Sequence, residues 1–234
     1  MSDSIRLLSG GAAQGLVGQL KGLFQTQSGL EVQGTFGAVG AMRDMLLAGA
    51  PCDVLILTQA LIEQLARDGD VAPGSSAALG VVKTGVAVKS GEQAPPMDTA
   101  PALRSALLGA KGIYFPDPVK ATAGIHFMKV LKTLGIAEQL TGRLRPFPNG
   151  ASAMREMAQC TDKGLIGCTQ VTEILYTPGV QLTGLLPVEF ELATVYTAAL
   201  CSRATQPEAA RQFIAMMAGA YAAKLRAEGG FEVA

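Results

Sequence analysis

The chain has 234 residues, of which 49% are hydrophobic and 16% charged, with 28 Gly and 12 Pro. These proportions are typical of a folded globular protein and exclude a largely disordered chain. Nineteen basic residues balance nineteen acidic residues. Because no net field attracts polyanions, we expect neither a nucleic-acid partner nor binding to an anionic membrane. No apolar run approaches the ~18 residues that a bilayer span needs, so membrane insertion is not expected.

The first residues lead directly into an apolar segment at 5–8, without the charged, apolar and small-residue regions of a signal peptide. The sequence as written therefore predicts a cytoplasmic protein. It would be periplasmic if a signal peptide had been removed, and only then would a membrane permease be its partner.

The first part of the chain alternates between extended and helical patterns. Strands are predicted over 5–8, 30–35 and 53–57, and helices over 13–27, 38–48 and 59–68. Such alternation favours parallel strand–helix–strand units.

The pattern then repeats, with strands predicted over 79–88, 112–115, 143–147, 164–168 and 189–200. Helices are predicted over 100–108, 123–134, 149–159, 171–176 and 207–226. The sequence therefore predicts two α/β lobes: lobe 1 over 1–84 and 189–234, and lobe 2 over 85–188. We expect the long strands at 79–88 and 189–196 to carry the chain between the lobes.

Two glycine-rich turns in the first half join a strand to a helix, at 8–14 and 35–41. Glycine lets the backbone approach a ligand, and the first turn of a helix offers unpaired N–H groups to an anion. Both turns should face the crevice where open α/β sheets bind ligands. The candidate ligand-binding residues here are Ser9, Gly10, Gly11, Gly37 and Ala38. Neither turn has the spacing of a nucleotide-phosphate loop.

Two segments in the second half, at 117–126 and 148–152, contain the N-terminal turn of a helix, here called a helix opening, and offer similar groups. Their candidate residues are Thr122, Ala123, Asn149, Gly150 and Ser152. Four openings, two from each half, could surround one small anion.

His126 is the only histidine, and its side chain is the only one whose ordinary pKa lies near neutrality. We expect it in the first turn of a helix, where it could act as a base. The alternative is a structural or surface histidine.

The four cysteines are widely spaced and are expected to be buried free thiols. No cluster of His, Cys, Asp and Glu has metal-ligand spacing, so we expect neither a metal nor a cofactor.

Several segments, taken in order, resemble the molybdate-binding proteins of ABC transporters, which have the type II periplasmic-binding-protein fold. They are Ile5–Leu8, Phe36–Ala41, Gly49–Val54, Asp117–Pro118 with Ala123–Gly124, and Gly164–Gly167. The resemblance implies an α/β fold with two lobes and a ligand cleft between them.

In that family, serines of the first two turns, backbone amides of the second lobe and a tyrosine bind the oxyanion. Here Ala12 and Ala38 occupy the places of the serines, and Gln170 that of the tyrosine. Loss of these hydroxyl donors disfavours molybdate and favours a planar carboxylate. A carboxylate could use Ser9, Gly10, Gly11, Thr122, Asn149, Ser152, Thr169 and Gln170.

The sequence also resembles aconitate isomerase, which implies a proton shift with His126 as the base. Three hypotheses therefore stand: a binding module for a di- or tricarboxylate, an isomerase of an unsaturated carboxylate, and a molybdate or tungstate receptor. In each, the partner is a small anionic ligand.

Overall fold

A computed structural model describes residues 4–233 and divides them into two compact units. Unit 1 contains the chain up to Val82 and from Thr194 onward, and unit 2 contains Lys83–Ala193. The predicted lobe boundaries lie after residues 84 and 188. The first is two residues after the end of unit 1 at Val82, and the second is five residues before the end of unit 2 at Ala193. Residues 1–3, on which part of the expectation about the N-terminus rests, lie outside the described residues.

Unit 1 contains a sheet in the order β2-β1-β3-β9-β4, in which β1 runs parallel to β2 and β3, and β9 runs antiparallel to β3. Its elements are β1 (Ser4–Gly10), η1 (Gly11–Ala13), α1 (Gln14–Ser28), β2 (Glu31–Gly37), α2 (Val39–Leu47), β3 (Val54–Thr58), α3 (Gln59–Arg67), the first part of β4 (Ala77–Lys89), β9 (Ala193–Leu200), α8 (Pro207–Ala218), η4 (Ala220–Ala222) and α9 (Ala223–Glu228).

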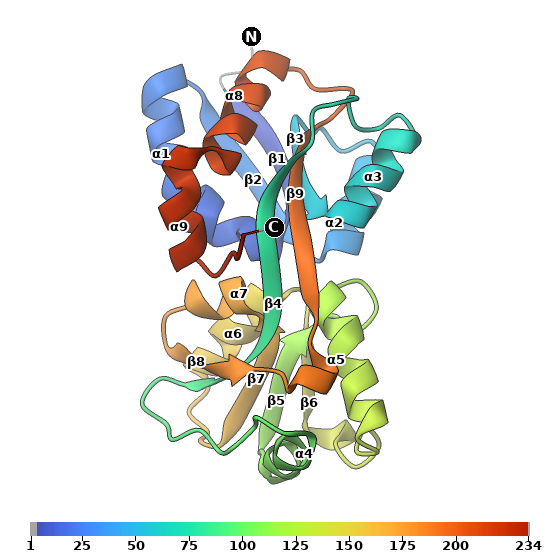
Figure 1. Cartoon of the computed structure of the whole chain (residues 1–234), viewed down its shortest axis with the longest axis vertical. Coiled ribbons are helices and arrows are strands. Elements are labelled where there is room, and N and C mark those ends of the chain that lie inside the picture. Colours follow the sequence, from blue (N-terminus) through green and yellow to red (C-terminus); the bar gives the residue numbers. More distant parts are fainter. Residues whose placement is uncertain (1–3, 234) are drawn as a thin grey trace. The chain divides into compact units, whose positions relative to one another are not determined.

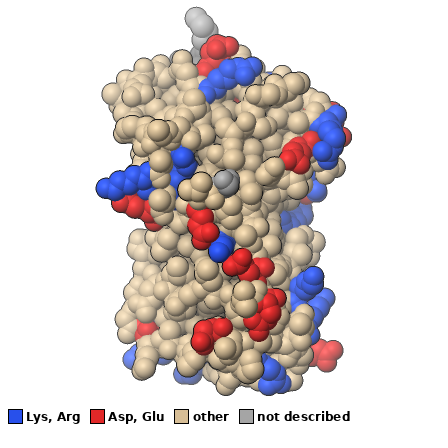
Figure 2. Space-filling view, viewed as in Figure 1, with Lys and Arg blue, Asp and Glu red and all other residues tan. Residues whose placement is uncertain are grey.

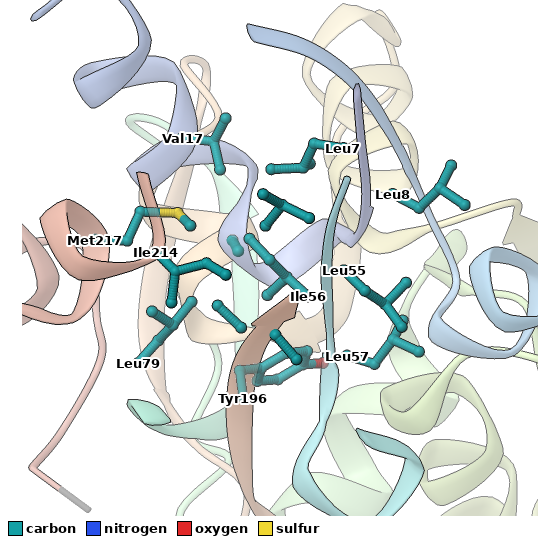
Figure 3. Packing of buried hydrophobic residues seen from close by; sticks show 14 of the residues in the cluster. Leu7, Leu8, Val17, Leu55, Ile56, Leu57, Leu79, Tyr196, Ile214 and Met217 are labelled. Carbon is teal, nitrogen blue, oxygen red and sulfur yellow. The ribbon is translucent and has the colours of Figure 1, made fainter. Parts of the chain in front are cut away.

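The core of unit 1 lies on both faces of this sheet, because alternate residues of a strand point to opposite faces. In Figure 3, Leu7 and Ile56 lie on the side of α1 and α8, near Val17, Ile214 and Met217. Leu8, Leu55 and Leu57 lie on the other side. Helices α2 and α3 contact the sheet there, whereas α1 packs on α8 through the Phe24 and Phe213 rings, whose centroids are 4.9 Å apart.

Asp53, at the start of β3, forms hydrogen bonds with β1 and with the residues before α8. The sequence suggested only that it begins a strand. One carboxylate oxygen accepts a hydrogen bond from the Arg6 amide of β1 at 2.7 Å. The other accepts from the amides of Thr205 and Gln206, at 2.6 and 3.0 Å, just before α8. A buried carboxylate is stable only with such partners, so Asp53 has a structural role.

Unit 2 contains strands in the order β4-β7-β5-β6, with β8 also paired to β4. Strand β5 runs parallel to β6 and β7, whereas β4 is antiparallel to β7 and β8. Its elements after β4 are α4 (Ala100–Gly109), β5 (Gly112–Pro116), α5 (Thr122–Thr133), η2 (Thr141–Arg143), β6 (Leu144–Phe147), α6 (Gly150–Gln159), β7 (Leu165–Gln170), α7 (Val171–Leu175), β8 (Val180–Leu185) and η3 (Val188–Phe190). In Figure 1, α5 lies on one side of this sheet and α6 on the other.

Three elements differ from the sequence prediction. Strand β8 was not predicted, although its residues alternate between apolar and polar types. The predicted strand at 189–200 begins only at Ala193, because the chain after Pro187 first forms η3. The predicted terminal helix breaks at Gly219, where the backbone is extended, and Arg226 donates to the carbonyls of Met217 and Gly219 there.

The cysteines agree with the sequence prediction except for the burial of Cys160. All four are free thiols; Cys52, Cys168 and Cys201 are buried and Cys160 is half-buried. Burial raises the pKa of the Cys168 thiol. These side chains serve as small apolar groups of the two cores.

Candidate functional site

The carboxyl ends of β1, β2 and β3 lie together at one edge of the unit 1 sheet, since β1 is central and parallel to both neighbours. Gly10 and Gly37 are direct partners at the ends of β1 and β2. The next residues open η1 and α2, so the structure brings together the predicted residues Ser9, Gly10, Gly11, Gly37 and Ala38. This edge is where an open α/β sheet binds its ligands.

The side chains of Val39 and Tyr196 approach the backbone of Gly10 closely. A Cβ atom there would lie 2.8 Å from the Val39 side chain and 3.1 Å from the Tyr196 ring. Tyr196 lies in β9, where it pairs with Thr58 at the end of β3. Tyr196 was not among the predicted site residues, because nothing in the local pattern showed that β9 pairs with β3.

Unit 1 offers backbone amides at this edge rather than side-chain donors. The buried Ser9 hydroxyl donates to the Gly10 carbonyl at 2.8 Å and so is engaged within the chain. Ala38 stands at the N-cap of α2, where alanine gives no side-chain cap. The first amides of α2 therefore remain available to an anion.

The carboxyl ends of β5, β6 and β7 likewise share one edge of the unit 2 sheet, because β5 lies between the other two. They end at Pro116, Phe147 and Gln170, and helices α5, α6 and α7 begin shortly after them. The predicted residues Thr122, Ala123, Asn149, Gly150, Ser152, Thr169 and Gln170 all belong to these openings.

The α5 opening resembles that of α2. Its N-cap is Ala121, which gives no side-chain cap, and Thr122 and Ala123 are the first two helical residues. The turn before it is fixed by Asp117, whose carboxylate accepts from the amides of Val119 and Lys120 at 2.7 and 2.9 Å. Two hydrogen bonds thus fix the turn that precedes the first amides of α5, a position that favours an anion.

The α6 opening, in contrast, is occupied by the chain's own groups. The Asn149 side chain accepts from the Ser152 amide at 2.8 Å. The carboxylate of Glu173 accepts from the amide of Ala151 at 3.3 Å and from the Thr169 hydroxyl at 2.5 Å. An internal carboxylate therefore sits at this helix N-terminus, where the macrodipole favours negative charge.

Glu173 was not among the predicted site residues. Burial raises the pKa of its carboxyl group, while hydrogen bonds from Thr169 and from the amides of Ala151, Gly150 and Gln170 act in the opposite direction. A Cβ atom on Gly150 would overlap both Thr169 and Glu173, at 1.9 and 2.0 Å, so only glycine fits there. The spacing of Thr169 and Glu173, four residues apart across the start of a helix, was the available signal.

Four polar atoms at or near this edge of unit 2 have no hydrogen-bond partner within residues 4–233. They are both amide atoms of Gln170 and the hydroxyls of Thr84 and Thr172, all buried. Thr84 of β4 pairs directly with Gln170 of β7. Directly opposed residues of antiparallel strands point to the same face, with Cβ atoms about 5 Å apart. Gln170 and Thr84 therefore form an unsatisfied polar pair.

His126 lies elsewhere than predicted. Helix α5 begins at Thr122, so His126 is its fifth residue and falls beyond the first four amides. Its Nε2 atom lies 2.8 Å from the carbonyl oxygen of Phe190, in η3. If Nε2 donates this hydrogen bond, only Nδ1 remains to act as a base.

Two pockets lie away from these edges. One of about 420 Å³ in unit 2 is lined by Val88, Ala106 and the first residues of β7, Leu165 and Ile166, among others. Another of about 480 Å³ in unit 1 lies between α1 and α8. Their linings are mainly apolar, and neither pocket includes any of the predicted site residues.

Charged side chains are sparse on the face drawn in Figure 2, which consists mostly of uncharged residues.

Within the described part of the chain, no group of three His, Cys, Asp or Glu residues is placed to hold a metal ion. No helix among those residues is both long and apolar enough to span a bilayer.

Comparison with known proteins agrees with this geometry. A family model described as bacterial extracellular solute-binding protein matches residues 5–232. Aconitate isomerase of a Pseudomonas species is 24% identical over 240 residues, which cover 98% of this chain and 87% of that protein.

Solved structures share the fold at low sequence identity. The periplasmic molybdate-binding protein of Azotobacter vinelandii has a TM-score of 0.81 and 21% identity, covering 99% of this chain and all of that chain. The sulfate-binding protein SubI of Mycobacterium tuberculosis has a TM-score of 0.73 and 18% identity, covering 97% and 86%. The predicted fold class, a two-lobed α/β fold of the type II periplasmic binding proteins, is confirmed.

Proposed function

Because the chain belongs to the bacterial extracellular solute-binding proteins, we propose that it binds a small organic carboxylate, a di- or tricarboxylate. The observation that carries this proposal is the unsatisfied amide of Gln170, 2% exposed and opposite the equally unsatisfied Thr84. A buried polar group without a partner costs about 1–3 kcal/mol. A ligand that pairs with these polar atoms, which lie at the ligand edge of the sheet, would account for them.

The negative charge of the ligand follows from the helix openings. Helices α2 and α5 begin behind Ala38 and Ala121, which leave the first amides uncapped. Helix α4 is instead capped by Thr99 and α6 by Asn149. Helices α1, α3, α7 and α8 also begin without a side-chain cap, so uncapped helix N-termini occur in both units, and each carries about half a positive charge that favours an anion.

The preference for a carboxylate over a tetrahedral oxyanion follows from the few hydroxyl donors. The resemblance to molybdate-binding proteins implies serines at positions 12 and 38, where this chain has alanine. The Ser9 hydroxyl, which could have replaced them, donates to Gly10. A tetrahedral oxyanion presents four oxygens around one atom, and such a site would leave them underpaired, whereas each planar carboxylate group presents only two.

Isomerisation of an unsaturated carboxylate is the second candidate, supported by the similarity to aconitate isomerase over nearly the whole chain. A 1,3-proton shift needs a base beside an activated carbon. His126 is the candidate base, through Nδ1, because Nε2 lies beside the Phe190 carbonyl. The test is proton NMR of cis- and trans-aconitate with the protein: interconversion that His126→Ala abolishes supports this reading, and no interconversion contradicts it.

Thermal unfolding against a ligand panel tests the binding proposal. The panel contains succinate, citrate, both aconitate isomers, sulfate, phosphate, molybdate and tungstate. A carboxylate at about 100 times its Kd should stabilise the fold by ~2.7 kcal/mol. For a chain of this length that raises Tm by roughly 5–11 °C. Stabilisation by molybdate or tungstate alone would refute the carboxylate and favour an oxyanion receptor.

Two variants test the role of the unsatisfied pair. Gln170→Leu and Thr84→Val replace groups that have no partner by apolar groups of similar size, so unliganded Tm should stay the same or rise while the ligand-induced shift falls. The matched control is Gln139→Leu, because Gln139 is an exposed glutamine of the same unit. A marked loss of unliganded stability in Gln170→Leu would show that its amide is already satisfied, contrary to the proposal.

A further inference from the structure

The unsatisfied atoms of unit 2 include acceptors as well as donors. Gln170 has two unpaired amide positions, one the donor Nε2 and the other the acceptor Oε1. Exchanging the two atoms by rotating the amide changes nothing, because neither position has a partner among the described residues. A ligand that pairs with both positions has to supply an acceptor to one and a donor to the other.

An ionised carboxylate can satisfy only half of this requirement. Its oxygens accept hydrogen bonds, so they can pair with Nε2 of Gln170 and with the hydroxyl hydrogens of Thr84 and Thr172. They cannot donate to Oε1 of Gln170. With a ligand made only of carboxylates, one buried carbonyl oxygen would remain without a partner.

Resting on the proposed function, we infer that the ligand is a hydroxycarboxylate, whose hydroxyl group donates to Oε1 of Gln170 while a carboxylate accepts from Nε2. Thr84 lies directly opposite Gln170, and its hydroxyl can donate to the oxygen of the same ligand hydroxyl. In this arrangement Gln170 is the residue that distinguishes a hydroxy acid from its deoxy analogue.

Matched ligand pairs test this inference. Malate and succinate differ only by one hydroxyl, as do citrate and tricarballylate. A site built to bind a hydroxyl rejects the analogue that lacks it, so we expect the hydroxy acid of the productive pair to bind at least about tenfold more tightly. Calorimetry gives the ratio of the two Kd values, and ligand-observed NMR extends it to weak binding.

The variant Gln170→Met removes both amide atoms and should bring this ratio close to one, although both ligands bind more weakly. The exposed Gln139→Met, as the control, should leave the ratio unchanged. Equal affinity of both members of each pair for the wild type would overturn the inference while leaving carboxylate binding intact. A ratio that persists in Gln170→Met would overturn the assignment to Gln170. Failure of all four acids to bind would instead refute the proposed function.

Discussion

Replacing Gly124 by alanine tests how α5 is seated on the end of β5. A Cβ atom at this position would lie 2.3 Å from the carbonyl oxygens of both Pro116 and Asp117. These are backbone atoms, so no side-chain rotation can relieve the overlap. Because ordinary contact begins near 3.4 Å, the start of α5 would have to move by about 1 Å.

Overpacking of this kind costs about 1–3 kcal/mol. For a chain of this length we expect Tm to fall by roughly 2–12 °C. The same displacement moves the uncapped amides of α5, so the Tm shift produced by a carboxylate should also shrink. Differential scanning fluorimetry with and without citrate measures both effects.

Gly109→Ala is the matched control. Gly109 ends α4 in the same unit, and a Cβ atom there would meet nothing within 4 Å. This variant should melt within about 2 °C of the wild type or slightly above it. If Gly124→Ala melts and binds like Gly109→Ala, the close packing of α5 on the end of β5 is wrong.

Three further variants address single interactions. Asp53→Asn should lower the free energy of unfolding by at least ~2 kcal/mol in urea, because an amide cannot accept from every donor that faces Asp53; an unchanged midpoint would contradict its role. Burial raises the pKa of the Glu173 carboxyl group, so the folded chain binds the carboxyl proton more tightly than the unfolded chain does. The contribution of this group to the free energy of unfolding therefore falls as pH rises above ~4.3. Glu173→Gln should flatten this decline, and urea unfolding at about pH 5 and about pH 8 checks it; an equally steep decline would refute it. His126→Ala should cost ~1 kcal/mol through the lost contact with Phe190 and leave carboxylate binding unchanged if His126 is structural.

Local patterns were enough to predict most of the fold. The alternation of short apolar runs with amphipathic segments placed the parallel strands β1, β2, β3, β5, β6 and β7 and the helices after them. Side-chain caps such as Asn149 also follow from local residue types. The terminal helix was predicted too long because its apolar pattern continues past Gly219, where the backbone becomes extended and the carbonyls of Met217 and Gly219 accept hydrogen bonds from Arg226.

The site could be predicted only in part, because residue types alone do not show which hydrogen-bond partner each polar side chain has. The turns that hold Gly10 and Thr122 were found from glycine content and helix openings. Whether a polar side chain at such a turn is free depends on its partners. Ser9 and Thr169 are engaged by Gly10 and Glu173, which their residue types alone do not show.

The pairing of Thr84 with Gln170 joins residues 86 positions apart, since 170 − 84 = 86. No local pattern in either strand predicts which residues face each other across an antiparallel pair. The feature that carries the proposed function therefore became visible only with the strand register.

Isothermal titration of the wild-type chain with citrate and, separately, with molybdate tests the central claim most directly. We expect saturable 1:1 binding of citrate or another member of the carboxylate panel and no heat of binding with molybdate. Saturable binding of molybdate together with no binding of any carboxylate would contradict the account, and it would show that Ala12 and Ala38 do not exclude a tetrahedral oxyanion.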